Sequence, residues 1–193
     1  MKKEIKNIFE SSINSKINVL KDELLWENTQ KVIEEIINAI KNGRKILTMG
    51  NGGSAADAQH FAGEFVNRFL FDRKPLPAIS LSTDTSVLTC IANDYSFDLI
   101  FEKQVKALAQ EGDILFGITT SGNSENIIKA FETGKKIGTI NVGLLGKDGG
   151  KAKNYVDYAI IVKENSTPRI QEIHITLIHI ICEIVEKEVA KIQ

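Results

Sequence analysis

Hydroxyl side chains are concentrated in one short loop, Thr119-Thr120-Ser121-Gly122-Asn123-Ser124. An apolar run over residues 114–118 precedes it, and a helical pattern over 125–131 follows. Where a parallel strand turns into a helix, free backbone N–H groups and the helix dipole favour an anion. The loop lacks Lys and the Walker spacing, so it predicts a site for a phosphorylated small molecule rather than a nucleoside triphosphate. The alternative is a helix N-cap, but a cap needs one hydroxyl and this loop carries four.

A second candidate loop, Asn51-Gly52-Gly53-Ser54, follows an apolar run over residues 45–49. Glycines let the backbone approach a ligand closely, although a tight turn between a strand and a helix is the alternative. Both loops fall at the carboxyl ends of predicted strands, where doubly wound sheets bind their ligands. Asn93 and Asp94 end a predicted helix and are either a polar C-cap or part of the same pocket.

His60 and Glu64 lie four residues apart on a predicted helix, so both side chains share one face. An imidazole and a carboxylate on adjacent turns suit half of a zinc site or an acid–base pair. The alternative is an ordinary solvent-exposed pair. The chain has only 3 histidines, and this one lies near the start of a helix that points at the predicted site. We therefore favour a functional pair.

The C-terminal helical pattern carries Gln171, His174 and His179 among many apolar residues. A helix that is apolar on most faces is buried, and its polar groups need partners. We expect a lone histidine there to be a hydrogen-bonded core residue. Gln171 and His179 are separated by roughly 12 Å along the helix axis. We therefore expect one of them to serve the site of a neighbouring chain.

The elements that position these residues alternate between short apolar strands and helices, which predicts a three-layer αβα doubly wound sheet of about five parallel strands. Two further helical patterns precede the first strand, and their apolar stripes suggest another subunit as partner. Nothing in the sequence suggests a second globular domain. Strands are predicted over 45–49, 78–81, 113–118, 139–145 and 158–162, and helices over 5–20, 26–40, 55–69, 85–93, 101–109, 124–137 and 169–191.

The composition of the 193 residues is ordinary, with 42% hydrophobic and 25% charged residues and a net charge of -1. This charge marks no nucleic-acid or anionic-membrane partner, so any attraction for an anion must be local. The most apolar stretch, residues 173–185, is interrupted by polar side chains, which argues against a membrane span. Cys90 and Cys182 both lie in apolar runs and are predicted to be buried free thiols. We expect a cytoplasmic protein.

Six motifs in this order resemble the sugar isomerase (SIS) domain family over nearly the whole chain. A small departure is Thr119, where the family usually carries serine. The resemblance implies a single SIS domain over 1–193, in which 1–43 is a helical hairpin used for oligomerisation. The motifs are residues 51–58, His60 with Glu64, Asn93-Asp94, the hydroxyl loop, Gly146-Lys147-Asp148-Gly149-Gly150, and residues 169–174 with His179.

Within that family the motifs are similar to those of the branch that acts on seven-carbon sugar phosphates. The resemblance implies interconversion of sedoheptulose 7-phosphate and D-glycero-D-manno-heptose 7-phosphate, the first step toward the activated heptoses of bacterial lipopolysaccharide core or capsule. It also implies a homotetramer with active sites between subunits. One zinc ion per subunit is expected at the positions of His60, Glu64, Gln171 and His179.

An aldose–ketose isomerase moves a proton between two carbons through an enediolate, which needs a base, an acid and oxyanion stabilisation. We predict Glu64 as the base, His179 as the acid or relay, and zinc as the Lewis acid. If Glu64 also binds the metal it must loosen to take the proton, and the sequence leaves this open. The predicted substrate contacts are Thr119, Thr120, Ser121 and Ser124 for the phosphate, and Asn51, Gly52, Gly53, Ser54, Glu64, Asn93, Asp94 and Gln171 for the sugar and the rest of the pocket.

Two alternatives stay open. One is a non-catalytic SIS-domain protein, either a scaffold such as one that binds a replication initiator or a sensor of sugar phosphates. The other is an isomerase or lyase for a different phosphosugar. A pure scaffold has no need of the complete set of His60, Glu64, Gln171 and His179, which favours an enzyme.

Overall fold

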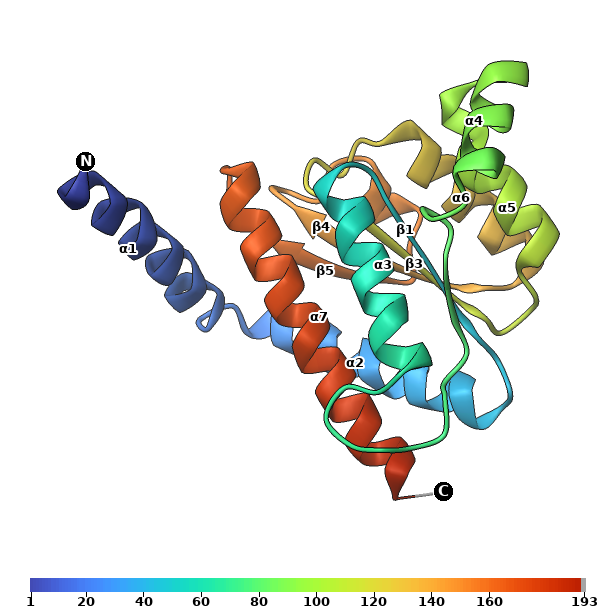
Figure 1. Ribbon diagram of the computed structural model, residues 1–193, viewed down its shortest axis with the longest axis horizontal. Helices are drawn as coiled ribbons and strands as arrows, with labels where there is room; N and C mark the ends of the chain where they lie inside the picture. The colour runs from blue at the N-terminus through green and yellow to red at the C-terminus, as the bar shows by residue number, and fades with distance from the viewer. Residues whose placement is uncertain (192–193) are drawn as a thin grey trace.

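A computed structural model, which describes residues 1–191, contains one parallel sheet of five strands (Figure 1). The strands are β1 (Ile46–Gly50), β2 (Ala78–Ser80), β3 (Ile114–Thr119), β4 (Ile140–Gly146) and β5 (Tyr158–Val162). Their order in the sheet is β2-β1-β3-β4-β5, and every neighbouring pair is parallel. The chain thus runs outward from β1 to β2 and then crosses back to β3. The switch point of the sheet lies between β1 and β3, as a doubly wound fold requires.

Helices cover both faces of this sheet, which explains why its strands are apolar on both sides. The side chain of Ile46 packs among helices on one face, and its neighbour Leu47 packs among helices on the other. Both side chains are fully buried. The first face carries α2 (Glu23–Lys41), α3 (Gly53–Val66) and α7 (Thr167–Ala190); the second carries α4 (Thr85–Asp94), α5 (Ile100–Leu108) and α6 (Glu125–Ile137). The three-layer prediction is confirmed.

The first helix, α1 (Lys2–Val19), projects from the body of the molecule (Figure 1). It runs away from α2 rather than back along it, so the predicted helical pair exists but does not form a hairpin. At the start of α7, Glu172 accepts from Ser12 of α1 at 2.5 Å and Arg169 donates to the carbonyl of Ile8 at 2.9 Å. Ser15 of α1 also donates to Glu164, in the loop before α7, at 2.8 Å. The apolar stripe of α1 is left uncovered, and Phe9 is 68% exposed.

Two details differ from the sequence predictions. The helix predicted over 55–69 ends at Val66, and Phe69 lies in the following loop. Cys182 is a buried free thiol as predicted, but Cys90 is exposed because α4 buries little besides Ile91. Within residues 1–191, no helix combines the length and the apolar character that crossing a bilayer requires.

Candidate active site

The hydroxyl loop turns directly from β3 into α6. The hydroxyl of Thr119 lies 3.0 Å from that of Ser124 and accepts the N–H of Gly122 at 3.2 Å. Ser121 accepts the N–H of Asn123 at 3.1 Å. Ser124 is the first residue before α6, yet its side chain makes no capping hydrogen bond. The first N–H groups of α6 therefore have no side-chain cap, which is the condition for an anion site.

The glycine-rich segment over 146–150 packs directly against the hydroxyl loop. A Cβ atom on Gly122 would lie 2.1 Å from the carbonyl oxygen of Gly149, and Gly122 has a φ of +66°. Its carbonyl accepts the N–H of Ala152 at 2.8 Å. Only glycine satisfies both the positive φ and the close approach.

The turn from β1 into α3 lies beside the hydroxyl loop. The side-chain amides of Asn51 and Asn126 exchange two hydrogen bonds of 3.0 Å, which tie this turn to the start of α6. Gly52, with a φ of +56°, precedes α3 and provides no side-chain cap. Two helix N-termini without side-chain caps thus lie at the switch point of the sheet, and Ser54 is buried in the first turn of α3.

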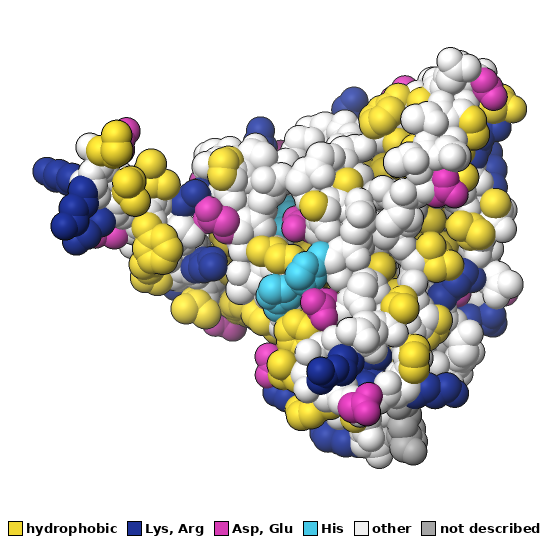
Figure 2. Space-filling view, in the orientation of Figure 1, with side chains coloured by type: hydrophobic (Ala, Val, Ile, Leu, Met, Phe, Trp, Pro, Cys, Tyr) yellow, Lys and Arg dark blue, Asp and Glu magenta, His cyan; other side chains and the backbone are white. Residues whose placement is uncertain are grey.

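His60, Glu64 and His179 come together from two helices. His60 Nε2 lies 3.0 Å from Glu64 Oε1 and 3.0 Å from His179 Nε2. The His60 and Glu64 side chains are 43% and 25% exposed, so the group is open to solvent. Histidine side chains are visible on the surface between α3 and α7, next to an acidic side chain (Figure 2). The predicted acid and base therefore lie within reach of a single ligand.

Gln171 lies further along the contact between α3 and α7, at the start of α3. A Cβ atom on Gly53 would lie 2.3 Å from Gln171 Nε2, so the amide packs directly on the backbone of Gly53. His179 meets His60 seven residues later on α3. The two helices run side by side in the same direction (Figure 1). Gln171 and His179 thus both contact α3 of their own chain, and the service of one of them to a neighbouring chain stays a prediction.

Burial changes the pKa of several groups near the contact between α3 and α7. It lowers the pKa of His179, and the nearby His60 adds to the effect while Glu64 opposes it. It raises the pKa of Asp57 to about 6, against a smaller opposing effect of His60. Asp57 Oδ2 is buried and has no hydrogen-bond partner among residues 1–191. Sequence reasoning gave Asp57 no role, although its spacing of three residues from His60 places both on one helix face.

Asn93, Asp94 and His174 are not part of the group formed by His60, Glu64 and His179. Asn93 and Asp94 are exposed near the end of α4, and Asn93 donates to Asp94 at 2.9 Å. Within the described residues, no three His, Cys, Asp or Glu side chains are arranged to hold a metal ion. His174 is fully buried as predicted, but its ring nitrogens make no hydrogen bond of good geometry in residues 1–191. Burial lowers its pKa to about 4, which the backbone of Leu145 partly offsets.

Residues 9–146 match the family model described as the SIS domain. This chain belongs to the SIS domain family. The match includes both loops and the His60–Glu64 pair. It stops at the end of β4, so α7 of this SIS domain lies outside the matched residues.

Relatives of this SIS domain match almost the whole chain. The phosphoheptose isomerase of Clostridium acetobutylicum is 56% identical over 188 residues, which cover 97% of this chain and 96% of the relative. That of Aneurinibacillus thermoaerophilus is 54% identical over 185 residues, covering 96% and 93%. The structure of phosphoheptose isomerase from Neisseria gonorrhoeae aligns with a TM-score of 0.90 at 42% identity, covering 96% of this chain and 98% of that one.

Proposed function

We propose that this SIS domain is a sedoheptulose 7-phosphate isomerase, which forms D-glycero-D-manno-heptose 7-phosphate. Relatives that match the chain from end to end are phosphoheptose isomerases. The observations that carry the proposal within this chain are the approach of Glu64 and His179 from two helices and the two helix N-termini without side-chain caps at the switch point of the sheet. These features supply an acid–base pair between α3 and α7 and an anion site at the carboxyl ends of β1 and β3.

The residues divide the work between the two ends of the substrate. Thr119, Thr120, Ser121 and Ser124 bind the phosphate together with the start of α6, and this binding positions the reacting end. Glu64 removes the proton from one carbon, and the enediolate receives it back on the neighbouring carbon. Burial lowers the pKa of His179, which favours the neutral imidazole that can relay a proton between the two oxygens.

We propose zinc as the ion bound by His60, Glu64 and His179, because imidazole nitrogen and carboxylate oxygen are its usual ligands, although no three such side chains of residues 1–191 surround a metal position as they stand. A single ring nitrogen carries at most one proton, yet His60 Nε2 faces both Glu64 Oε1 and His179 Nε2 at 3.0 Å. A cation bound by these three atoms would accept one lone pair from each and remove this conflict. We assign one zinc ion per subunit to His60, Glu64, Gln171 and His179, and the separation of Gln171 and His179 by roughly 12 Å along the helix axis supports supply of one of them by a neighbouring subunit. When bound, zinc supplies a Lewis acid for the substrate oxygens.

We further propose a homotetramer with active sites at subunit interfaces. The apolar side chains of α1 are uncovered, and Ile5, Ile8 and Phe9 are each more than half exposed. A hollow of about 700 Å³ lies between α2 and α7, and another of about 260 Å³ lies between α1 and α7. Such surfaces are typical of subunit contacts. We place the enzyme in the cytoplasm, in the supply of heptose for lipopolysaccharide core or capsule.

The alternative of a non-catalytic scaffold or sugar-phosphate sensor gains no support from the relatives reported above. The deciding experiment is incubation of the purified protein with sedoheptulose 7-phosphate, followed by NMR for the aldose. We expect formation of the heptose 7-phosphate, and loss of this activity with a chelator that zinc then restores. Turnover of a different ketose phosphate alone would identify another isomerase. No turnover of any phosphosugar by the zinc-loaded tetramer would refute the proposal.

A further inference from the structure

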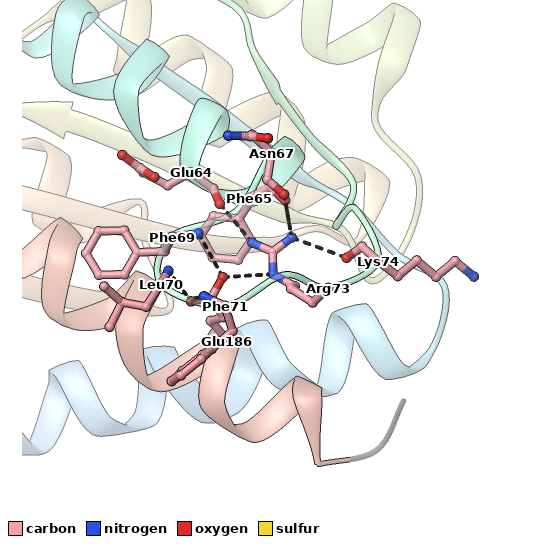
Figure 3. Close-up of polar contacts among 9 residues, drawn as sticks. All are labelled: Glu64, Phe65, Asn67, Phe69, Leu70, Phe71, Arg73, Lys74 and Glu186. Atoms are coloured by element: carbon pink, nitrogen blue, oxygen red, sulfur yellow. Dashed lines mark hydrogen bonds and ion pairs between the residues drawn. The ribbon is translucent and has the colours of Figure 1, made fainter.

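A buried ion pair lies at the far end of α3, between the two helices that carry the acid and the base (Figure 3). Glu186 of α7 is 1% exposed, and its carboxylate pairs with Arg73 Nε at 3.1 Å. The same carboxylate accepts the backbone N–H groups of Phe69, Leu70 and Phe71 at 2.8, 2.5 and 3.1 Å. Glu186 thus holds the loop after α3 against α7.

Arg73 uses its other nitrogen atoms on the end of α3. Its guanidinium donates to the carbonyls of Glu64 and Phe65 at 2.8 Å, and to those of Asn67 and Lys74 at 3.2 Å. The last carbonyls of a helix lack intrahelical partners and carry the negative end of the dipole, so a cation there is favourable. This cap explains why α3 ends at Val66, before the limit predicted from the sequence.

The bonds of this pair lead to both groups of the proposed acid–base machinery. On one side Arg73 holds the backbone carbonyl of Glu64, whose carboxylate meets His60. On the other side Glu186 holds the N–H of Phe69, whose ring contacts the ring of His179 with centroids 5.6 Å apart. A displacement of Arg73 would therefore move the backbone of Glu64 directly, and a displacement of Glu186 would move His179 through Phe69.

Stability alone is a weak reason for such a pair, because buried ion pairs are often no more stabilising than apolar side chains of the same volume. What the pair provides is a fixed position for the surrounding backbone. Its carboxylate and guanidinium together make seven hydrogen bonds to backbone groups at the end of α3 and in the loop that follows. We propose that Arg73 and Glu186 are positioning residues that hold Glu64 and His179 at the separation needed for proton transfer. This inference rests on the proposed isomerase function.

The test compares R73K and E186Q with a matched control, D113N. Lysine keeps the charge of Arg73 but cannot bond to several carbonyls at once, and glutamine keeps the shape of Glu186 without its charge. Asp113 is also a buried carboxylate, paired with Lys45 at 2.6 Å and accepting the backbone N–H groups of Lys45 and Gln110. It lies just before β3, and these bonds are to residues outside α3, α7 and the loop that follows α3.

For R73K and E186Q we expect kcat to fall by about 10- to 100-fold, because small displacements of catalytic groups have effects of this size. KM should stay within about twofold, because the phosphate loop lies at the other end of α3. D113N should lower the melting temperature without this change in kcat. An equal fall of kcat in D113N, or a rise of KM in place of a fall of kcat, would overturn the positioning role.

A second readout separates this inference from the proposed function. The His179 ring protons, identified with an H179Q variant, should shift in the NMR spectrum of zinc-free E186Q and R73K, because Phe69 moves relative to that ring. They should not shift in D113N. Unmoved His179 resonances in both variants would refute positioning even if the enzyme is an isomerase. Shifted resonances in a protein without isomerase activity would support the positioning and refute the proposed function.

Discussion

Replacement of Ser121 and Ser124 by alanine tests whether the hydroxyl loop binds the substrate phosphate. Ser124 lies at the N-terminus of α6, but its hydroxyl contacts Thr119 instead of capping the helix. Ser121 bonds to the backbone of Asn123 in the same loop. Both hydroxyls are thus held by their own loop, beside helix N–H groups that have no side-chain cap, and both can turn to donate to an anion.

The size of the effect follows from the charge of the ligand. A hydrogen bond to a charged group contributes about 1.5–3 kcal/mol. Loss of two such bonds at the lower figure removes about 3 kcal/mol, which corresponds to roughly a 150-fold loss of affinity. We expect the S121A/S124A variant to show a KM for sedoheptulose 7-phosphate raised to about that extent, with kcat changed only a few-fold. Competitive inhibition by inorganic phosphate should weaken in parallel.

Stability measurements separate this role from helix capping. Loss of a true N-cap costs about 1 kcal/mol, and each kcal/mol lowers the melting temperature of a domain of this size by about 2–4 °C. Asp84 is a true cap, because its carboxylate accepts the N–H of Val87 at 3.0 Å at the start of α4. We expect D84A to show that loss and S124A to show less than about 2 °C. Unchanged KM in the double variant, with S124A as destabilised as D84A, would refute the phosphate assignment.

Three further predictions address other parts of the chain. E64Q should lower turnover by at least about 100-fold while the assembly stays intact. Normal solvent exchange of the substrate C1 or C2 hydrogen in that variant would contradict the role of Glu64 as base. Between pH 6.5 and about 4, His174 is protonated in the unfolded chain but stays neutral in the folded chain. The free energy of unfolding should therefore be about 2 kcal/mol lower at pH 5 than at pH 7. Urea titrations of H174L should lack this contribution. G53A should fold normally but displace Gln171 and lower kcat/KM, and the same change in a Q171A background should have little further effect in a double-mutant cycle.

The sheet and its loops could be predicted from the sequence because local patterns determine them. Strands such as Ile114–Thr119 are short, apolar and followed by helices, which is enough to indicate a parallel sheet with both faces covered. Ligand loops then fall at the carboxyl ends of the strands by topology. The pairing of His60 with Glu64 was also local, because four residues of helix place them on one face.

Contacts between distant segments could not be predicted in this way. The helix pattern extended to Phe69, but Arg73 and Glu186 end α3 at Val66 through bonds that span more than a hundred residues. The direction of α1 depends on its bonds to the start of α7, so its sequence indicated an amphipathic helix but not its projection from the body. Cys90 lies in an apolar run, yet α4 sits at the edge of the molecule and leaves it exposed.

The polar residues of α7 are explained by the helix beside it. Gln171 meets the first turn of α3, His179 meets its middle at His60, and Glu186 holds the loop that follows its end. Parallel helices have the same rise per residue, so residues two turns apart on one helix meet residues two turns apart on the other. A shift of α7 by one turn would break all three contacts together. The register between α3 and α7 therefore brings the active-site residues together. The contact of Gln171 with Gly53 holds that register at the start of α3, and the buried pair of Arg73 and Glu186 holds it at the end.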